Sequence, residues 1–128
     1  MAAQQRPGPG GLLLGVVEVE GHPQPPRTLG RDDAERAFDD AVALTGHWTK
    51  AGTWYQIPYG SLLTREWPNL LVAGRCISVD HRVHHATKEI PACFATGQAA
   101  GTAAALAVRA GVAPADLHVD ALRARLRD

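Results

Sequence analysis

Residues 31–45 carry apolar side chains with the period of an amphipathic helix. The positions that would share one face are Ala34, Ala37, Phe38, Ala41, Val42 and Thr45. Asp32 and Asp33 would lie in the first turn, where the helix dipole favours negative charge. Gly46 follows as a stop signal. The pattern therefore predicts a helix over residues 31–45.

Two more helices are predicted toward the C-terminus. The longer one begins at Pro91, because proline is well tolerated in a first turn, and ends near Ala110, just before Gly111. The shorter one covers about residues 120–127 and follows Asp120 as its N-cap. Its buried edge is expected to consist of Val119, Leu122 and Leu126.

Short apolar and β-branched runs predict strands. Residues 16–19 favour one short strand, and residues 54–57 favour another that Pro58 ends or places at a sheet edge. Residues 70–73 form an uninterrupted apolar run closed by Gly74. Such a run is typical of a strand buried on both faces in a parallel sheet covered by helices.

Turn-forming and polar residues separate these elements. Residues 1–27 are rich in Gly and Pro and predict a flexible segment ahead of one folded unit over residues 28–128. Residues 67–69 predict a turn. Residues 77–89 are polar and predict a loop that joins the 70–73 strand to the long helix.

The long helix is lined with small residues. Gly97, Gly101 and Ala105 recur every four positions, beside a second row of Ala100, Ala104 and Val108. Glycine inside a helix costs roughly 1 kcal/mol relative to alanine, so two glycines on one face require a packing or ligand reason. The pattern predicts close approach of this face to a sheet, a helix or a ligand.

Composition narrows the class of protein. Thirteen Lys and Arg balance 13 Asp and Glu, so we expect neither a nucleic-acid partner nor a membrane-surface partner. The chain has 22 Ala against 28 Leu, Ile, Val and Phe, which leaves little bulk for a core. The aromatic residues between 48 and 67 are expected to supply that bulk. Two cysteines form no secreted disulfide framework, no run is long enough to span a membrane, and no signal peptide is evident, so a cytoplasmic location is expected.

The segments YQIPYGSLL, NLLVAGRCIS and IPACFATGQAAGTAAALAV, in this order and at this separation, resemble the C-terminal part of the FAD-dependent oxidoreductase family. The resemblance spans about residues 28–128. It implies an α/β fold: part of a Rossmann-type FAD domain, its last strand and long small-residue helix, with flanking helices and short strands. It also implies FAD as cofactor and flavin-mediated hydride or electron transfer on a small-molecule substrate.

The same resemblance implies site residues. Gly74 would lie beside the ribityl and phosphate region of the cofactor, with Arg75 next to it. The helix that follows would direct its first turn at the N1/O2 edge of the flavin through the backbone of Ile90, Pro91, Ala92 and Cys93. A positive helix end suits the negative charge that builds there in the reduced flavin.

The chain departs from the family pattern in three places. The fingerprint G-x-G-x-x-G is absent. Gly60 stands where many relatives have Arg, and His85 and Lys88 stand where relatives often have Gly and then Arg. The chain therefore has only a partial FAD site, and we expect the isolated polypeptide to bind no FAD and to be inactive.

Histidines and cysteines near this corner are further candidates. His81 and His84 are predicted catalytic residues, because His titrates near neutral pH; the alternative is a solvated loop that also contains His85. Cys76 and Cys93 could form a redox disulfide, but two small buried thiols are the favoured interpretation. A Cys₂His₂ zinc site from Cys76, His81, His84 and Cys93 has irregular spacing, so no metal is expected.

Two functional interpretations follow. The first is a C-terminal fragment of an FAD-dependent oxidoreductase. The second is a non-enzymatic α/β interaction module, or a subunit that pairs with a separate FAD-binding chain. Either one predicts that the long helix exposes an apolar face or hides it by self-association.

Overall fold

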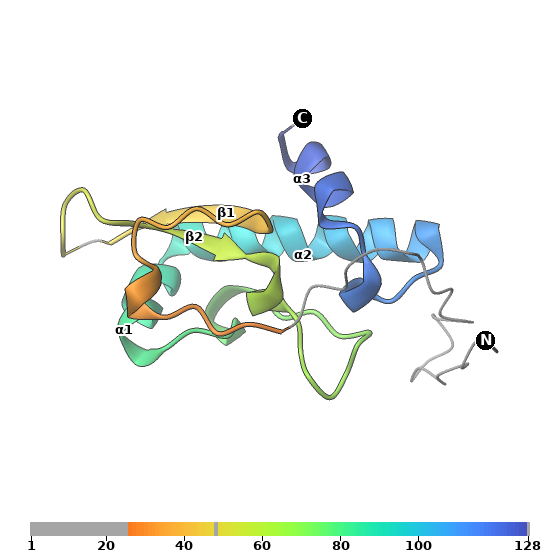
Figure 1. The fold of residues 1–128 in the computed structure, drawn as a ribbon, viewed down its shortest axis with the longest axis horizontal. Helices are drawn as coiled ribbons and strands as arrows, with labels where there is room; N and C mark the ends of the chain where they lie inside the picture. The colour runs from red at the N-terminus through yellow and green to blue at the C-terminus, as the bar shows by residue number, and fades with distance from the viewer. Residues whose placement is uncertain (1–25, 48, 128) are drawn as a thin grey trace.

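The computed structural model describes residues 26–47 and 49–127, so the predicted strand at 16–19 and almost all of the predicted flexible segment lie outside the described residues. In the described part, β1 (Ala41–Gly46) and β2 (Trp54–Pro58) form an antiparallel sheet, and α1 (His81–Thr87), α2 (Ile90–Ala110) and α3 (Val119–Arg127) follow. The sheet lies along one side of α2, and α3 packs against both α2 and β1 (Figure 1). The architecture is therefore α/β, with α2 as its longest element.

The predicted helix over residues 31–45 is wrong. Only Arg31–Asp33 form a single 3-10 turn, and Glu35 adopts φ +59°, a left-handed conformation that ends any helix there. The chain reverses and becomes β1, which pairs with β2 from Gly46 opposite Trp54 to Ala41 opposite Pro58. Pairing with a neighbouring strand has overridden a local helical period.

The predicted strand at 70–73 is not a regular strand. Leu71 makes one isolated antiparallel bridge to Leu63, and the N–H of Val72 donates to the carbonyl of Leu62 at 2.9 Å. An interior strand of a parallel sheet has a parallel neighbour on each side, whereas the one bridge made by Leu71 is antiparallel. Among the described residues, residues 70–73 pair with a neighbouring segment, residues 62–63, on one side only.

The predicted loop over residues 77–89 is also wrong, because residues 81–87 form α1. Asp80 is the N-cap, and its carboxylate accepts a hydrogen bond from the N–H of Val83 at 2.7 Å. One face of this short helix is buried through Val83, Ala86 and Thr87.

Several predictions are confirmed. Residues 54–57 lie in β2, a turn follows Trp67, and α2 runs to Ala110 with Gly111 as a left-handed C-cap at φ +69°. The last helix exists, but it begins at Val119, so Asp120 lies in its first turn and is not its N-cap.

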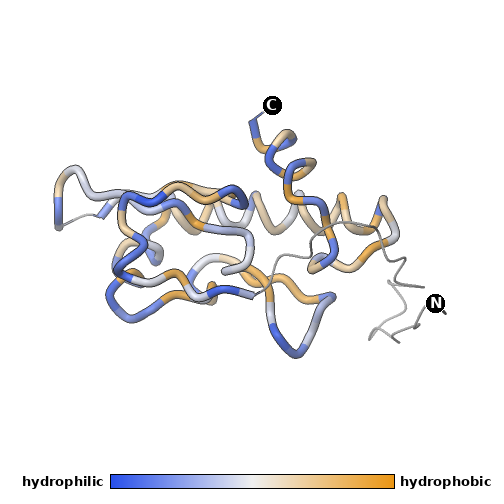
Figure 2. The backbone as a smooth tube through the Cα atoms, viewed as in Figure 1, coloured by the Kyte–Doolittle hydropathy of each residue, from blue (hydrophilic) through white to orange (hydrophobic). Residues whose placement is uncertain are grey.

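The core consists of two apolar clusters to which β2 and the three helices contribute residues. Figure 2 shows apolar stretches of the chain recurring along α2. Tyr55 and Tyr59 belong to the two clusters, as the aromatic segment predicted, whereas Trp67 is exposed. The buried residues of α2 are all small: Ala92, Thr96, Ala99, Ala103 and Ala107. Small side chains let the helix backbone approach the sheet closely.

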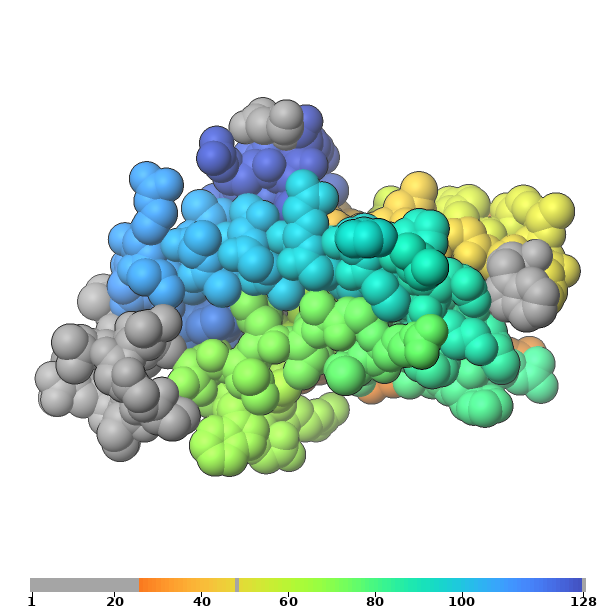
Figure 3. Space-filling view, turned by 180° about the vertical axis from the view of Figure 1, so that it is seen from behind, coloured from red at the N-terminus to blue at the C-terminus, as the bar shows by residue number. Residues whose placement is uncertain are grey.

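The opposite face of α2 carries the row that was predicted to pack. Gly97 and Gly101 are exposed there, and an added Cβ would meet no described atom within 4 Å at either position. We call this face the outer stripe, and it consists of Ile90, Phe94, Gly97, Gly101, Ala104 and Val108. It lies along the front of the molecule in Figure 3. The prediction of an exposed apolar face is confirmed, and the close packing predicted for the glycines is not seen among the described residues.

None of the described helices is both long enough and apolar enough to cross a membrane.

Candidate functional site

A shallow hollow of about 320 Å³ opens at the start of α2. Its lining residues are Arg75, Lys88, Ile90, Cys93 and Phe94. Three of them, Arg75, Ile90 and Cys93, are predicted cofactor-binding residues. The structure therefore brings half of the predicted set together on one surface.

Gly74 is held against α2 beside this hollow. Its φ of +65° is a backbone conformation that side chains disfavour, so glycine is required here for its conformation. Its N–H donates to the hydroxyl of Thr96 at 2.9 Å, and that hydroxyl donates to the carbonyl of Ala92 at 2.9 Å. An added Cβ would lie 3.8 Å from the sulfur of Cys93. Gly74 and the first turn of α2 thus form one connected corner.

Two cations border the corner. Arg75 donates through Nε to the carbonyl of Lys88 at 3.4 Å, which ties the 3-10 turn Gly74–Cys76 to the junction between α1 and α2. Lys88 also lines the hollow. Both side chains are cationic at neutral pH, so the hollow presents positive charge beside an apolar wall of Ile90 and Phe94.

The start of α2 adds to this charge. Glu89 is the N-cap, but its side chain makes no capping hydrogen bond, and Pro91 follows in the first turn. The first N–H groups of a helix have no partner within it, and they carry about half a positive charge. The backbone of Ile90 and Ala92 therefore completes a site suited to an anion or to the electron-rich edge of a ring.

Sequence reasoning missed three members of this corner. The patterns gave no role to Phe94 or Thr96, and Lys88 was only a departure from the family pattern. Thr96 could have been noticed as a polar residue on an otherwise alanine face. The positions of Lys88 and Phe94 beside the hollow depend on the angle between α1 and α2, and no local sequence pattern reveals that angle.

The three candidate histidines, His81, His84 and His85, lie on α1, and none of them lines the hollow. The rings of His81 and His85 meet edge to face with centroids 5.5 Å apart, and both side chains are exposed. His84 is half-buried. A catalytic role for His81 and His84 stays a prediction.

Both cysteines are free: Cys76 is exposed, and Cys93 is half-buried with its thiol 3.5 Å from the carbonyl of Lys88. The disulfide is therefore absent from this structure, and the interpretation of two buried thiols is wrong for Cys76. Across the described ranges, no group of three or more His, Cys, Asp and Glu side chains could hold a metal ion. The four residues of the zinc alternative do not converge.

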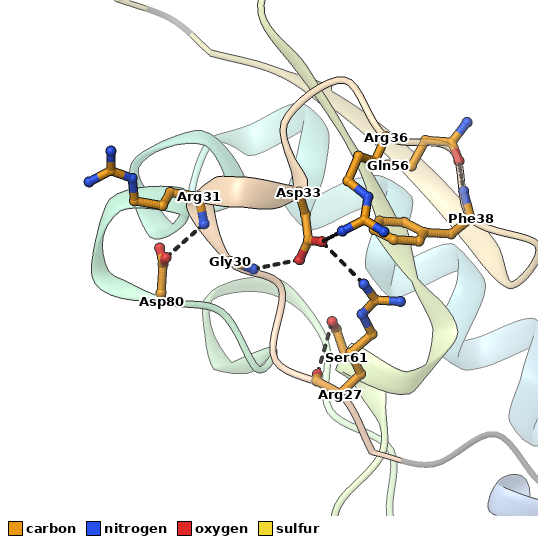
Figure 4. A network of polar contacts seen from close by, with 9 residues as sticks. All are labelled: Arg27, Gly30, Arg31, Asp33, Arg36, Phe38, Gln56, Ser61 and Asp80. Atoms are coloured by element: carbon orange, nitrogen blue, oxygen red, sulfur yellow. Dashed lines mark hydrogen bonds and ion pairs between the residues drawn. The ribbon is translucent and has the colours of Figure 1, made fainter.

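A polar network lies away from the hollow and fixes residues 27–36 (Figure 4). Asp33 is buried and accepts from the N–H of Gly30 at 3.0 Å, from Arg27 at 3.2 Å and from Arg36 at 3.1 Å. Arg27 also stacks over the ring of Phe38, 4.0 Å from its centroid. All of these partners of Asp33 come from residues 27–36, so the network has a structural role in holding this segment.

Asp80 links this region to α1. Burial alone would raise the pKa of its carboxyl. Hydrogen bonds from the N–H groups of Val83, Arg31 and Arg82, with the charge of Arg31, outweigh burial and hold that pKa below its ordinary value. The N–H of Arg31 donates to it at 2.8 Å. Asp80 is therefore an ionised clamp at neutral pH.

Comparison with known protein families identifies the family of the chain. A family described as FAD dependent oxidoreductase matches residues 27–126. The chain belongs to the FAD-dependent oxidoreductase family. Comparisons with curated proteins and with solved structures gave no match.

The residues at the corner fit one end of FAD. Gly74 has no side chain to block a ligand, and the first turn of α2 offers N–H donors beside two cations. The pyrophosphate requires the fingerprint G-x-G-x-x-G, which this sequence lacks. The corner is therefore compatible with an anionic or electron-rich part of FAD, and the sequence supplies no dinucleotide fingerprint for the rest of the cofactor.

Proposed function

We propose that this chain is the C-terminal portion of an FAD-dependent oxidoreductase and that the corner at α2 supports the flavin. The observation that carries the proposal is that Gly74 is bonded to α2 through Thr96 beside a hollow lined by Arg75, Lys88 and the start of α2, in a chain whose family uses FAD. FAD, when bound, supplies hydride or electron transfer.

Each residue of the corner has a distinct proposed role. Gly74 lets the ribityl and phosphate region approach, and Arg75 neutralises negative charge next to it. The first turn of α2, through Ile90, Pro91, Ala92 and Cys93, directs its positive end at the N1/O2 edge. These groups stabilise the more reduced form of the cofactor by electrostatics.

The remainder of the site is proposed to come from outside this sequence. A Rossmann-type FAD domain binds pyrophosphate and ribose through its first βα turn. We propose that a separate FAD-binding portion completes the domain, and that this chain alone is inactive. His81 and His84 are proposed to face the substrate in the completed protein. The family match gives the alternative, a non-enzymatic module, no support.

The test combines the chain with the FAD-binding N-terminal portion of a family member, expressed separately. We expect Arg75→Ala to weaken FAD binding to the mixture by about tenfold, the effect of losing one charge-assisted contact of roughly 1.4 kcal/mol. Arg109→Ala, an exposed arginine near the far end of α2, is the matched control. Equal effects of the two substitutions would overturn the assigned role of Arg75.

His81→Ala and His84→Ala test the catalytic proposal in the same mixture. Loss of turnover with unchanged FAD binding supports it, and His85→Ala, on the same short helix, is the control. If all three substitutions leave turnover unchanged, the histidines belong to a solvated surface.

A further inference from the structure

Two imidazole rings lie next to each other on the exposed face of α1. His81 and His85 are four residues apart, which places them on successive turns of the same helix face. Their ring centroids are 5.5 Å apart, and the ring planes meet at 78°. Both residues are exposed, whereas the buried face of the helix consists of Val83, Ala86 and Thr87. The pair is therefore open to solvent and adds little to the core.

The backbone that carries these two rings is anchored at both ends of α1. At its start, the carboxylate of Asp80 accepts a hydrogen bond from the N–H of Val83 at 2.7 Å. Near its end, the hydroxyl of Thr45 in β1 donates to the carbonyl of Ala86 at 2.9 Å. The helix lies at the end of the molecule where α2 begins (Figure 1). Because the backbone is held and the two side chains are exposed, the rings can rotate without disturbing the fold.

We propose that His81 and His85 form a two-ligand site for a divalent late transition-metal ion such as Ni²⁺, Cu²⁺ or Zn²⁺. Imidazole is a common ligand of these ions, and two histidines at i and i+4 on one helix face bind zinc in the motif H-E-x-x-H. With metal–nitrogen bonds of about 2.1 Å, the centroids of two rings on one ion lie roughly 5 Å apart. The centroids of His81 and His85 are already 5.5 Å apart. Rotation of the rings is enough to direct one nitrogen of each at a shared ion.

This site differs from a closed structural metal centre. Within the part of the chain that the structure describes, no group of three or more His, Cys, Asp and Glu side chains could hold a metal. The chain therefore supplies two ligands, and water fills the other positions around the ion. Asp80, which is ionised at neutral pH, adjoins His81 in the chain and favours a cation there. Arg82 is exposed, so salt screens its repulsion of the ion.

Calorimetric titration of the full chain with Ni²⁺ tests the site. Ni²⁺ is the better probe because a free thiol such as that of Cys76 competes for Zn²⁺. We expect His81→Ala and His85→Ala each to weaken Ni²⁺ binding by at least about tenfold, since even the loss of a group that supports a ligand costs that much. His84→Ala, on the same helix, and His118→Ala, an exposed histidine elsewhere, are the matched controls and should keep the affinity. Unchanged affinity in His81→Ala and His85→Ala, or an equal loss in a control, overturns the proposal.

Hydrogen exchange gives a second readout that locates the bound ion. An ion held by both rings ties two turns of α1 together, so Ni²⁺ should slow the exchange of the amides of residues 84–87 several-fold. Mg²⁺, which prefers oxygen ligands, should not slow it. The slowing should persist in His118→Ala and vanish in His85→Ala, and equal slowing in both variants would contradict the proposal. No flavin enters these measurements, and the catalytic proposal concerns His81 and His84, so failure here leaves the flavin assignment intact.

Discussion

The two faces of α2 are built from similar residues but have different surroundings. The inner face packs Ala99, Ala103 and Ala107 against the sheet and α3 with essentially no exposure. The outer stripe is equally rich in small residues, yet Phe94 and Val108 are exposed there. Small residues on a helix thus indicate that something approaches closely, but not which face already has its neighbour.

The largest expected contrast in stability comes from placing one leucine side chain on each face of α2. Ala103→Leu overpacks a fully buried position and should lower the free energy of unfolding by about 1–3 kcal/mol. Ala104→Leu, the next residue and an exposed one, should change it by less than about 0.5 kcal/mol. Urea unfolding of both variants measures the difference. Similar losses would mean that the outer stripe is also packed.

A second prediction concerns a buried hydrogen bond in the apolar cluster that packs against the inner face of α2. The hydroxyl of Tyr59 is buried and donates to the carbonyl of Pro114 at 2.9 Å, and burial raises the pKa of this hydroxyl well above its ordinary value. Tyr59→Phe should therefore cost about 1–2 kcal/mol, because a buried carbonyl loses its donor. Thermal unfolding provides the measurement, with Tyr55→Phe in the other cluster as the control. No loss of stability in Tyr59→Phe would show that this contact does not form.

A substitution on the outer stripe should raise the free energy of unfolding instead of lowering it. Gly101→Ala should raise the free energy of unfolding by up to about 1 kcal/mol, because alanine favours the helix and its Cβ meets open space. Gly74→Ala should instead be destabilising, because Gly74 has φ +65°. A loss of stability in Gly101→Ala would mean that a covering partner needs the glycine.

The smallest expected effect on stability concerns Asp80, which lies outside both faces of α2. This effect depends on pH. Because hydrogen bonds hold the pKa of Asp80 below its unfolded value of 3.8, the ionised carboxylate contributes stability above that value. This contribution is lost as the pH falls through the folded-state pKa. Asp80→Asn keeps one N-cap acceptor, so it should cost only about 0.5 kcal/mol at pH 7. Unfolding between pH 2 and 6 should show a weaker pH dependence in the variant, and equal slopes would contradict the assignment.

Local signals were sufficient for some elements of the fold. Pro91 and Gly111 bracket α2, and the aromatic run of β2 ends at its proline, because caps and proline act on the nearest residues. The helix over 31–45 failed because strand pairing with residues 54–58 is not visible in a local period. The helix α1 was missed although Asp80 stands before it as a good N-cap.

The candidate site shows the same division. Gly74, Arg75 and the start of α2 were identified from motifs that are continuous in sequence. Lys88, Phe94 and Thr96 were not, because their positions depend on how α1, α2 and the Gly74–Cys76 turn pack together. The resemblance to the family supplied roles that neither spacing nor composition could supply.

The most direct test of the flavin assignment is a titration of the purified chain with FAD, followed by flavin fluorescence. The account predicts no saturable change for the chain alone. It predicts a saturable change when the FAD-binding N-terminal portion of a family member is present, tighter than with that portion by itself. Saturable binding to the chain alone, or no gain from adding the chain, would contradict the account.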